Sequence, residues 1–124
     1  MKSCQTHEVS LYIGNIRGYN GEPFTKDDVI KAISEYQIAK GNECVSVRVT
    51  STTFVVKDYV ERGFEVAAIN YPRFPKKPVA IEQFMVGLAN CLLITFQQNR
   101  ISVVGAENTI LIEAPNPEQH PAPK

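Results

Sequence analysis

The chain has 124 residues, of which 44% are hydrophobic and 21% charged, which suits one globular domain with its own core. Thirteen basic residues balance thirteen acidic ones, so the chain lacks the positive field that attracts nucleic-acid phosphates. The three cysteines show no CxxC or metal-ligand spacing, which argues against a disulfide framework and favours a reducing, cytoplasmic location. Nucleic acid is not a favoured partner, and neither a cofactor nor a metal is predicted.

The first third of the chain predicts a strand, a loop and a helix. Residues 8–16 alternate apolar and polar side chains with the period of two that a half-buried strand requires. Residues 17–23 are dense in turn formers, with two glycines and a closing proline, and predict a loop. Thr25 and Asp28 have the spacing of a capping box, so a helix is expected to begin there and to stop at Gly41.

The middle of the chain predicts a hairpin. Residues 44–56 alternate valines with polar residues and continue with β-branched side chains, which favours a long strand. The charged stretch 57–63 is expected to connect it to a second strand at 64–71. Three prolines and three cations then predict a stiff, basic loop before the next helix.

The second expected helix, residues 79–99, carries no formal charge from Gln83 to Asn99. A helix that is apolar on most of its circumference cannot leave a whole side in water. We therefore expect the sheet to cover one side and a second subunit to cover the other. A membrane span is not predicted, because amide side chains interrupt the segment and a span needs about 20 predominantly apolar residues. The predicted oligomer interface comprises Val86, Asn90, Leu93, Ile94 and Gln97.

Short strand patterns at 100–104 and 109–113 follow the second helix. The resulting order, β-α-β-β-α-β, predicts a ferredoxin-like α+β fold of the split βαβ type, an antiparallel sheet with both helices on one face. An additional C-terminal strand fits the same pattern. We expect a single domain at residues 1–114 and a proline-rich mobile tail at 115–124.

Two loops are candidate ligand sites. Glycines in the loop 14–21 expose backbone amides beside a helix start, which attracts anions. The segment 71–77 combines cations with aromatic rings, which suits a phosphate or a stacked base. Each also has a plain structural explanation, as a glycine-rich connector and as a rigid solvated loop. The candidate ligand-binding residues are Arg17, Tyr19, Asn20, Arg73, Phe74, Lys76 and Lys77.

No catalytic set emerges from the sequence. His7 precedes the first strand and His120 lies in the tail, so neither pairs with a nucleophile along the chain. The acidic residues have structural explanations at helix starts and turns. An enzyme is therefore the less favoured class, and no catalytic residue is predicted.

Three functions remain open. The first is a non-enzymatic oligomeric domain with a binding site at the interfaces between subunits. Its ligand is an anionic small molecule, for example a nucleotide, or a protein partner. The second is a phosphate-directed hydrolase of the acylphosphatase-like type that uses Arg17 and the loop after the first strand. The third is a structural or inhibitory protein-interaction module that makes contact through its open sheet face.

Overall fold

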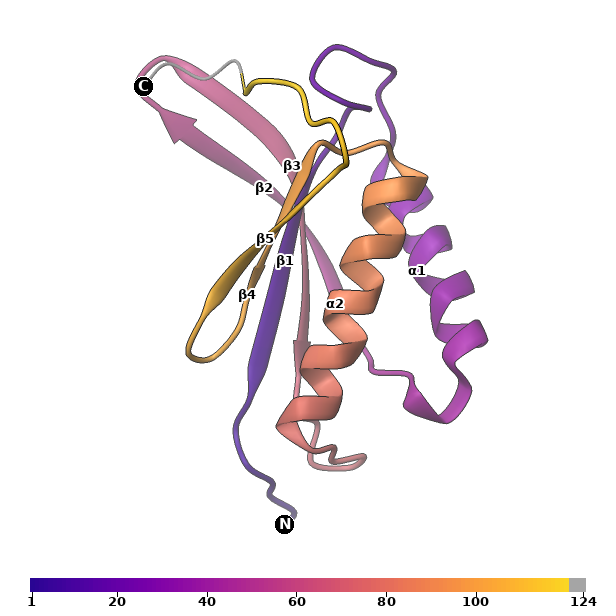
Figure 1. Cartoon of the computed structure of the whole chain (residues 1–124). Coiled ribbons are helices and arrows are strands. Elements are labelled where there is room, and N and C mark those ends of the chain that lie inside the picture. The colour runs from indigo at the N-terminus through magenta and orange to yellow at the C-terminus, as the bar shows by residue number, and fades with distance from the viewer. Residues whose placement is uncertain (121–124) are drawn as a thin grey trace.

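The computed structural model describes residues 1–120, which form one antiparallel sheet with two helices packed on the same face (Figure 1). The sheet order is β2-β3-β1-β4-β5. This confirms the predicted ferredoxin-like arrangement, with β5 as the additional strand at one edge. The elements in chain order are β1 (Glu8–Gly14), α1 (Lys26–Lys40), the 3-10 turn η1 (Gly41–Glu43), β2 (Arg48–Val56), β3 (Tyr59–Ile69), α2 (Pro78–Thr95), β4 (Arg100–Val104) and β5 (Thr109–Glu113).

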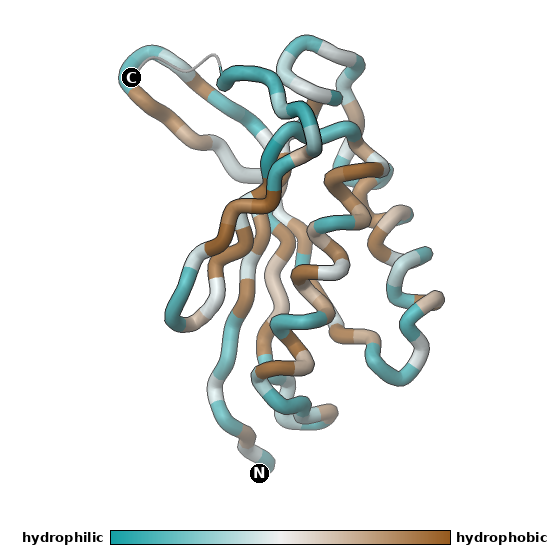
Figure 2. The backbone as a smooth tube through the Cα atoms, in the orientation of Figure 1, coloured by the Kyte–Doolittle hydropathy of each residue, from teal (hydrophilic) through white to brown (hydrophobic). Residues whose placement is uncertain are grey.

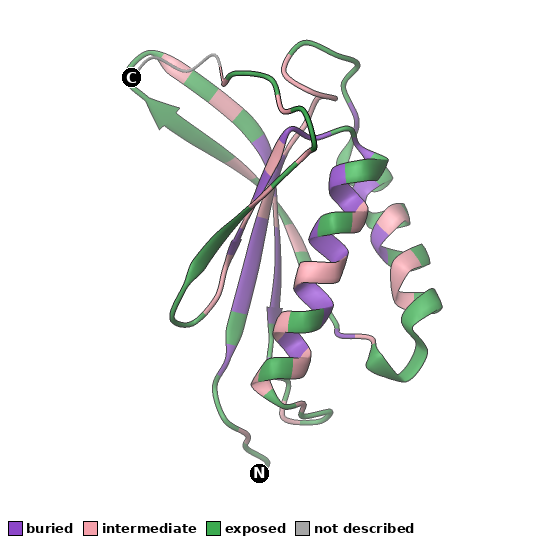
Figure 3. Cartoon of the chain, viewed as in Figure 1, coloured by how far each residue is buried: buried purple, intermediate pink, exposed green. Residues whose placement is uncertain are grey.

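The core lies between the helices and the sheet, and within residues 1–120 no helix covers the opposite face of the sheet (Figures 1 and 3). Alternate residues of β1, such as Leu11, point to the helices and are fully buried. From α2 the core receives Ile81, Phe84, Met85, Leu88, Ala89, Leu92 and Leu93. Burying one side of a sheet in this way leaves the other side free to form a binding surface.

Helix α1 begins where the capping pattern predicts. The Thr25 hydroxyl accepts a hydrogen bond from the Asp28 amide at 3.2 Å, and the Asp28 carboxylate accepts one from the Thr25 amide at 2.8 Å. The two bonds satisfy amides that have no partner inside the helix. Gly41 ends α1 with a φ of +57°, a conformation that glycine adopts at little cost.

The β2–β3 hairpin differs from the sequence prediction. Its connection is only Lys57 and Asp58, with Lys57 at a φ of +58°, so β3 begins at Tyr59 rather than at residue 64. The hairpin extends beyond the helices, and most residues at its tip are exposed on both faces (Figure 3). Because neither face is buried there, the apolar alternation that marks a strand is lost. β2 likewise begins at Arg48 and not at residue 44.

Helix α2 ends at Thr95, short of the predicted Asn99. Gln97 adopts a φ of +50°, and the Gln98 amide donates to the Leu93 carbonyl oxygen at 2.9 Å. This is the hydrogen-bond pattern of a Schellman motif, with glutamine where glycine is usual. The chain is thereby turned directly into β4.

The outer flank of α2 is uncharged and exposed. Ile94 is 77% exposed, and Asn90 and Gln97 also face solvent, whereas Leu93 is only 7% exposed and belongs to the core. Leu93 is therefore not available to a second chain, contrary to the prediction. By length and composition α2 could span a membrane, but it packs on the sheet as a core helix does (Figure 2).

Candidate functional site

One row of side chains crosses all strands on the face away from the helices. The pairing places Glu65 of β3 between Thr50 of β2 and Tyr12 of β1, and Tyr12 pairs in turn with Ser102 of β4. Leu111 of β5 completes the row opposite Ser102. Polar groups from distant parts of the sequence thus meet at the middle of the open face.

Tyr12 and Glu65 form the central pair of this row. The Tyr12 hydroxyl donates to Glu65 Oε2 at 2.7 Å, and the Thr50 hydroxyl lies 3.5 Å from Glu65 Oε1. Donation to the carboxylate raises the pKa of Tyr12, and partial burial raises it further, so the hydroxyl stays protonated at neutral pH. The Phe54 ring packs edge-on against Tyr12 with centroids 5.2 Å apart. This part of the open sheet face therefore carries one carboxylate fixed by hydrogen bonds and two aromatic rings.

A cleft of about 410 Å³ extends from Tyr12 and Phe54 to the end of β1 and the β2–β3 hairpin. Its walls come from the half of the β2–β3 hairpin near its turn, the loop after β1 and the start of β4. Its volume falls within the range of small-molecule sites, which are about 300–1,000 Å³. Among its lining residues are Tyr19, Tyr59, Glu61, Asn99, Arg100 and His120.

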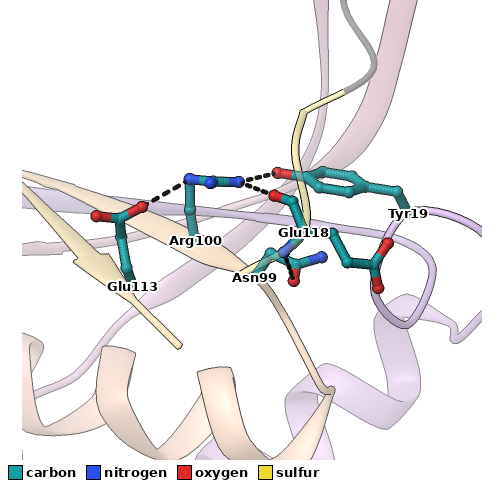
Figure 4. Close-up of polar contacts among 5 residues, drawn as sticks. All are labelled: Tyr19, Asn99, Arg100, Glu113 and Glu118. Atoms are coloured by element: carbon teal, nitrogen blue, oxygen red, sulfur yellow. Dashed lines mark hydrogen bonds and ion pairs between the residues drawn. The ribbon is translucent and has the colours of Figure 1, made fainter. Parts of the chain in front are cut away.

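Arg100 organises one wall of the cleft (Figure 4). Its Nε donates to Glu113 at 2.8 Å, and its Nη1 donates to the Tyr19 hydroxyl at 2.8 Å and to the Glu118 carbonyl oxygen at 2.6 Å. The bond to Tyr19 raises the pKa of Arg100, so its charge is permanent. Because Glu113 balances that charge, Arg100 positions its neighbours more than it attracts an anion.

Asn99 supplies an unsatisfied donor beside Arg100. The residue is 9% exposed, and its Oδ1 accepts a hydrogen bond from the Glu118 amide at 2.8 Å. Among residues 1–120, its buried Nδ2 has no hydrogen-bond partner. A buried amide without a partner is costly, and an acceptor atom in the cleft would satisfy it.

The C-terminal segment lies against this cleft, where the sequence predicts a mobile tail. The Glu118 backbone bonds to Asn99 and Arg100, and the His120 ring reaches Glu61 with an Nε2–Oε2 distance of 2.9 Å. The sequence places His120 in the tail without a partner along the chain, and the fold brings it to the cleft because the tail returns across the sheet. Residues 121–124 of the predicted tail lie outside the described residues.

The candidate residues of the loop after β1 have different positions. Tyr19 lines the cleft, and Asn20 is exposed outside it. Arg17 donates to the Thr95 carbonyl oxygen at 2.8 Å, and its guanidinium carbon lies 5.6 Å from the centre of the Phe96 ring. Arg17 thus stabilises the negative end of α2, which removes the observation that favoured a phosphate-directed hydrolase.

The basic segment 71–77 lies at the other end of α2. The helix has 18 residues, about 27 Å, so the two candidate loops do not form one site. Lys76 Nζ donates to the Asn42 carbonyl oxygen at 3.2 Å, and Arg73 stacks on Phe74. Lys77 precedes α2 and is exposed. The structure therefore gives these residues local roles and leaves their predicted ligand untested.

Sequence reasoning missed most of the residues that line the cleft. Tyr12 occupies a polar position of the alternation in residues 8–16, and that signal was present in the sequence. Glu61 had no such signal, because the sequence predicts a connection at 57–63 where the structure continues β3. The contribution of His120 had no signal, because it depends on a tail that crosses the sheet.

The fold resembles that of solved structures of a phage SAM lyase. The complex of that lyase with S-methyl-5′-thioadenosine has a TM-score of 0.63 and 13% sequence identity, covering 92% of this chain and 94% of the other. The apo lyase has a TM-score of 0.64 and 14% identity, covering 90% and 92%. No protein-family model and no curated protein matches the sequence. At this identity the likeness establishes the fold, and one protein with that fold holds a small-molecule ligand.

Proposed function

We propose that this chain binds an adenosine-type nucleoside with a sulfur-linked 5′ substituent in the cleft of the open sheet face. The observation that carries the proposal is a cleft of about 410 Å³ lined by Phe54 and by Tyr12, whose hydroxyl is held by Glu65. The structural likeness to a protein bound to S-methyl-5′-thioadenosine supports the choice of ligand. The predicted small-molecule site is thereby moved from the basic loops to the sheet.

The cleft offers a carboxylate and aromatic faces that suit a neutral or cationic ligand. Glu61 lines the cleft next to Arg62 and offers carboxylate oxygens that accept hydrogen bonds from ribose hydroxyls or amino groups. Glu65 contributes indirectly, because it holds the hydroxyl of Tyr12, which lines the cleft. Aromatic faces such as those of Tyr12 and Phe54 attract cations, and a sulfonium is a cation. The fixed positive charge of Arg100 is already balanced by Glu113.

Titration of the protein with S-methyl-5′-thioadenosine, followed by calorimetry and by NMR, tests this proposal. We expect saturable binding and shifted resonances of open-face residues. ATP, which carries the same base with a polyanion, should bind more weakly. Glu65→Gln replaces the carboxylate that holds the Tyr12 hydroxyl in the cleft and should weaken binding about tenfold, the effect of losing one charge-assisted hydrogen bond. Glu35→Gln removes an exposed carboxylate on α1 and should change nothing. Stronger binding of ATP than of the thioether would refute the site assignment.

A second candidate is cleavage of SAM itself, favoured because both similar solved structures are of a SAM lyase. When the carboxylate of the methionine part attacks the carbon bonded to the sulfonium, a C–O bond forms as the C–S bond breaks, the electron pair of the C–S bond stays on sulfur, and the carbon chain leaves as a lactone. S-methyl-5′-thioadenosine then leaves as a neutral thioether and needs no proton donor. Incubation with SAM and chromatography of the products tests this activity. Formation of the thioether at the rate of a protein-free control would exclude it.

We also propose that two or more copies associate through the outer flank of α2. The supporting observation is a flank without formal charge on which Ile94 is 77% exposed. A second copy of the chain is a suitable partner, because two identical surfaces without formal charge do not repel each other. Native mass spectrometry at micromolar concentration should show an oligomer that Ile94→Glu dissociates. A monomeric wild-type protein would contradict the proposal, as would an oligomer that survives the substitution.

A further inference from the structure

The last described residue, His120, lines the cleft in which the nucleoside is proposed to bind. Asn99 and Arg100 hold the backbone of Glu118 from two sides, by bonds of 2.8 and 2.6 Å (Figure 4). The same Arg100 nitrogen holds the Tyr19 hydroxyl. The segment is thus anchored to the residues that build one wall of the cleft.

Beyond this anchor, the His120 imidazole inserts between two tyrosine rings. Its centroid lies 5.0 Å from that of Tyr19 and 5.5 Å from that of Tyr59, with interplanar angles of 75° and 70°. Its Nε2 lies 2.9 Å from Glu61 Oε2. One heteroaromatic ring therefore contacts two aromatic rings and a carboxylate at once.

These three partners fit the base of the proposed ligand. Imidazole is the five-membered half of a purine, and adenine adds an amino group that can donate to a carboxylate. Aromatic side chains hold bases by contact with their π-systems. We propose that Tyr19, Tyr59 and Glu61 form the adenine subsite, and that His120 occupies this subsite until the ligand displaces the tail. The inference rests on the proposed function. It assigns the place where the adenine binds and identifies His120 as the group of this chain that competes with adenine for that place.

The contact between His120 and Glu61 is one that a ligand can displace. The two side chains are 36% and 37% exposed, and polar contacts at such positions contribute little to stability. A tail that closes the subsite lowers the apparent affinity by the fraction of molecules that are open. If about nine molecules in ten are closed, opening the subsite permanently tightens binding about tenfold.

The test compares the binding of S-methyl-5′-thioadenosine and of free adenine to three full-length proteins by NMR titration. His120→Ala should bind both compounds about tenfold more tightly than the wild-type protein. Gln119→Ala, which alters the exposed neighbouring residue, should bind as the wild type does. A chain ending at Asn116, checked for folding by circular dichroism, should match or exceed His120→Ala. Ligand-induced shifts should include the rings of Tyr19 and Tyr59.

The outcomes separate this inference from the proposed function. If the wild type binds clearly and His120→Ala binds no more tightly, then His120 does not compete with the ligand. The ligand assignment would remain intact in that case. Tighter binding with shifts confined to Tyr12 and Phe54 would overturn the placement of the base. Absence of binding to all variants, including the truncated chain, would overturn both.

Discussion

Replacing Gln98 with alanine tests whether one buried amide holds the floor of the cleft together. Gln98 is 6% exposed. Its Oε1 accepts a hydrogen bond from the Gly14 amide at 2.9 Å, and its Nε2 donates to the carbonyl oxygens of Ile16 and Phe96 at 2.9 and 3.0 Å. One side chain therefore joins the end of β1, the loop that follows it and the C-terminal end of α2.

The expected cost follows from these three bonds. Each contributes about 1 kcal/mol net, so Gln98→Ala should lower the free energy of unfolding by about 3 kcal/mol. A domain of this size is stable by about 5–15 kcal/mol, which makes the loss substantial. With an m-value of about 1.5 kcal/mol/M in urea, the denaturation midpoint should fall by about 2 M.

Urea denaturation followed by circular dichroism measures this loss. Gln83→Ala removes an exposed amide from α2 and should cost no more than about 0.5 kcal/mol. Gln98→Glu keeps the acceptor for Gly14 but points a second acceptor at two carbonyl oxygens, so it should cost at least as much as alanine. A loss below about 1 kcal/mol for Gln98→Ala, at an unchanged m-value, would show that water replaces these bonds and would refute the reasoning.

Three further predictions concern stability. Thr25→Ala removes the capping box of α1 and should cost about 1 kcal/mol in the same assay; no loss would contradict it. A Cβ on Gly63 would overlap the Ile13 carbonyl oxygen, so Gly63→Ala should cost about 3 kcal/mol or more, and a near-neutral effect would show that β1 and β3 can separate. Because the pKa of Tyr12 is raised above 10.0, its contribution is complete below pH 10 and lost as pH rises through the folded pKa. The stability difference between wild type and Tyr12→Phe should therefore shrink in strongly alkaline urea titrations, and a constant difference would oppose this.

Local patterns in the sequence were sufficient to predict the element order. The alternation in residues 8–16, the Thr25–Asp28 spacing and the apolar stripe of the second helix each depend on neighbours in the chain. Right-handed crossovers then leave few topologies for β-α-β-β-α-β. The hairpin was misjudged because its tip has no core to face, so its strands carry no alternating pattern.

The candidate site depended far more on tertiary structure. The sequence predicted Tyr19 as a ligand-binding residue, and Tyr19 lines the cleft. It also predicted Arg17 and the segment 71–77 as ligand-binding, and these lie at opposite ends of α2. Both loops suggested an anion site, the first through glycine-bearing backbone amides and Arg17, the second through cations beside aromatic rings. Only the packing of Arg17 onto the end of α2 distinguishes a helix-stabilising cation from one offered to a ligand.

The sequence by itself therefore determined which segments are strands and helices and which faces they bury, since these follow from the spacing of apolar residues. Tertiary structure alone decided that Tyr12, Glu61 and His120 meet in one cleft, because strand register and the path of the tail bring together residues that are far apart along the chain. Such contacts depend on pairing across the sheet, and the local pattern of no single segment encodes them.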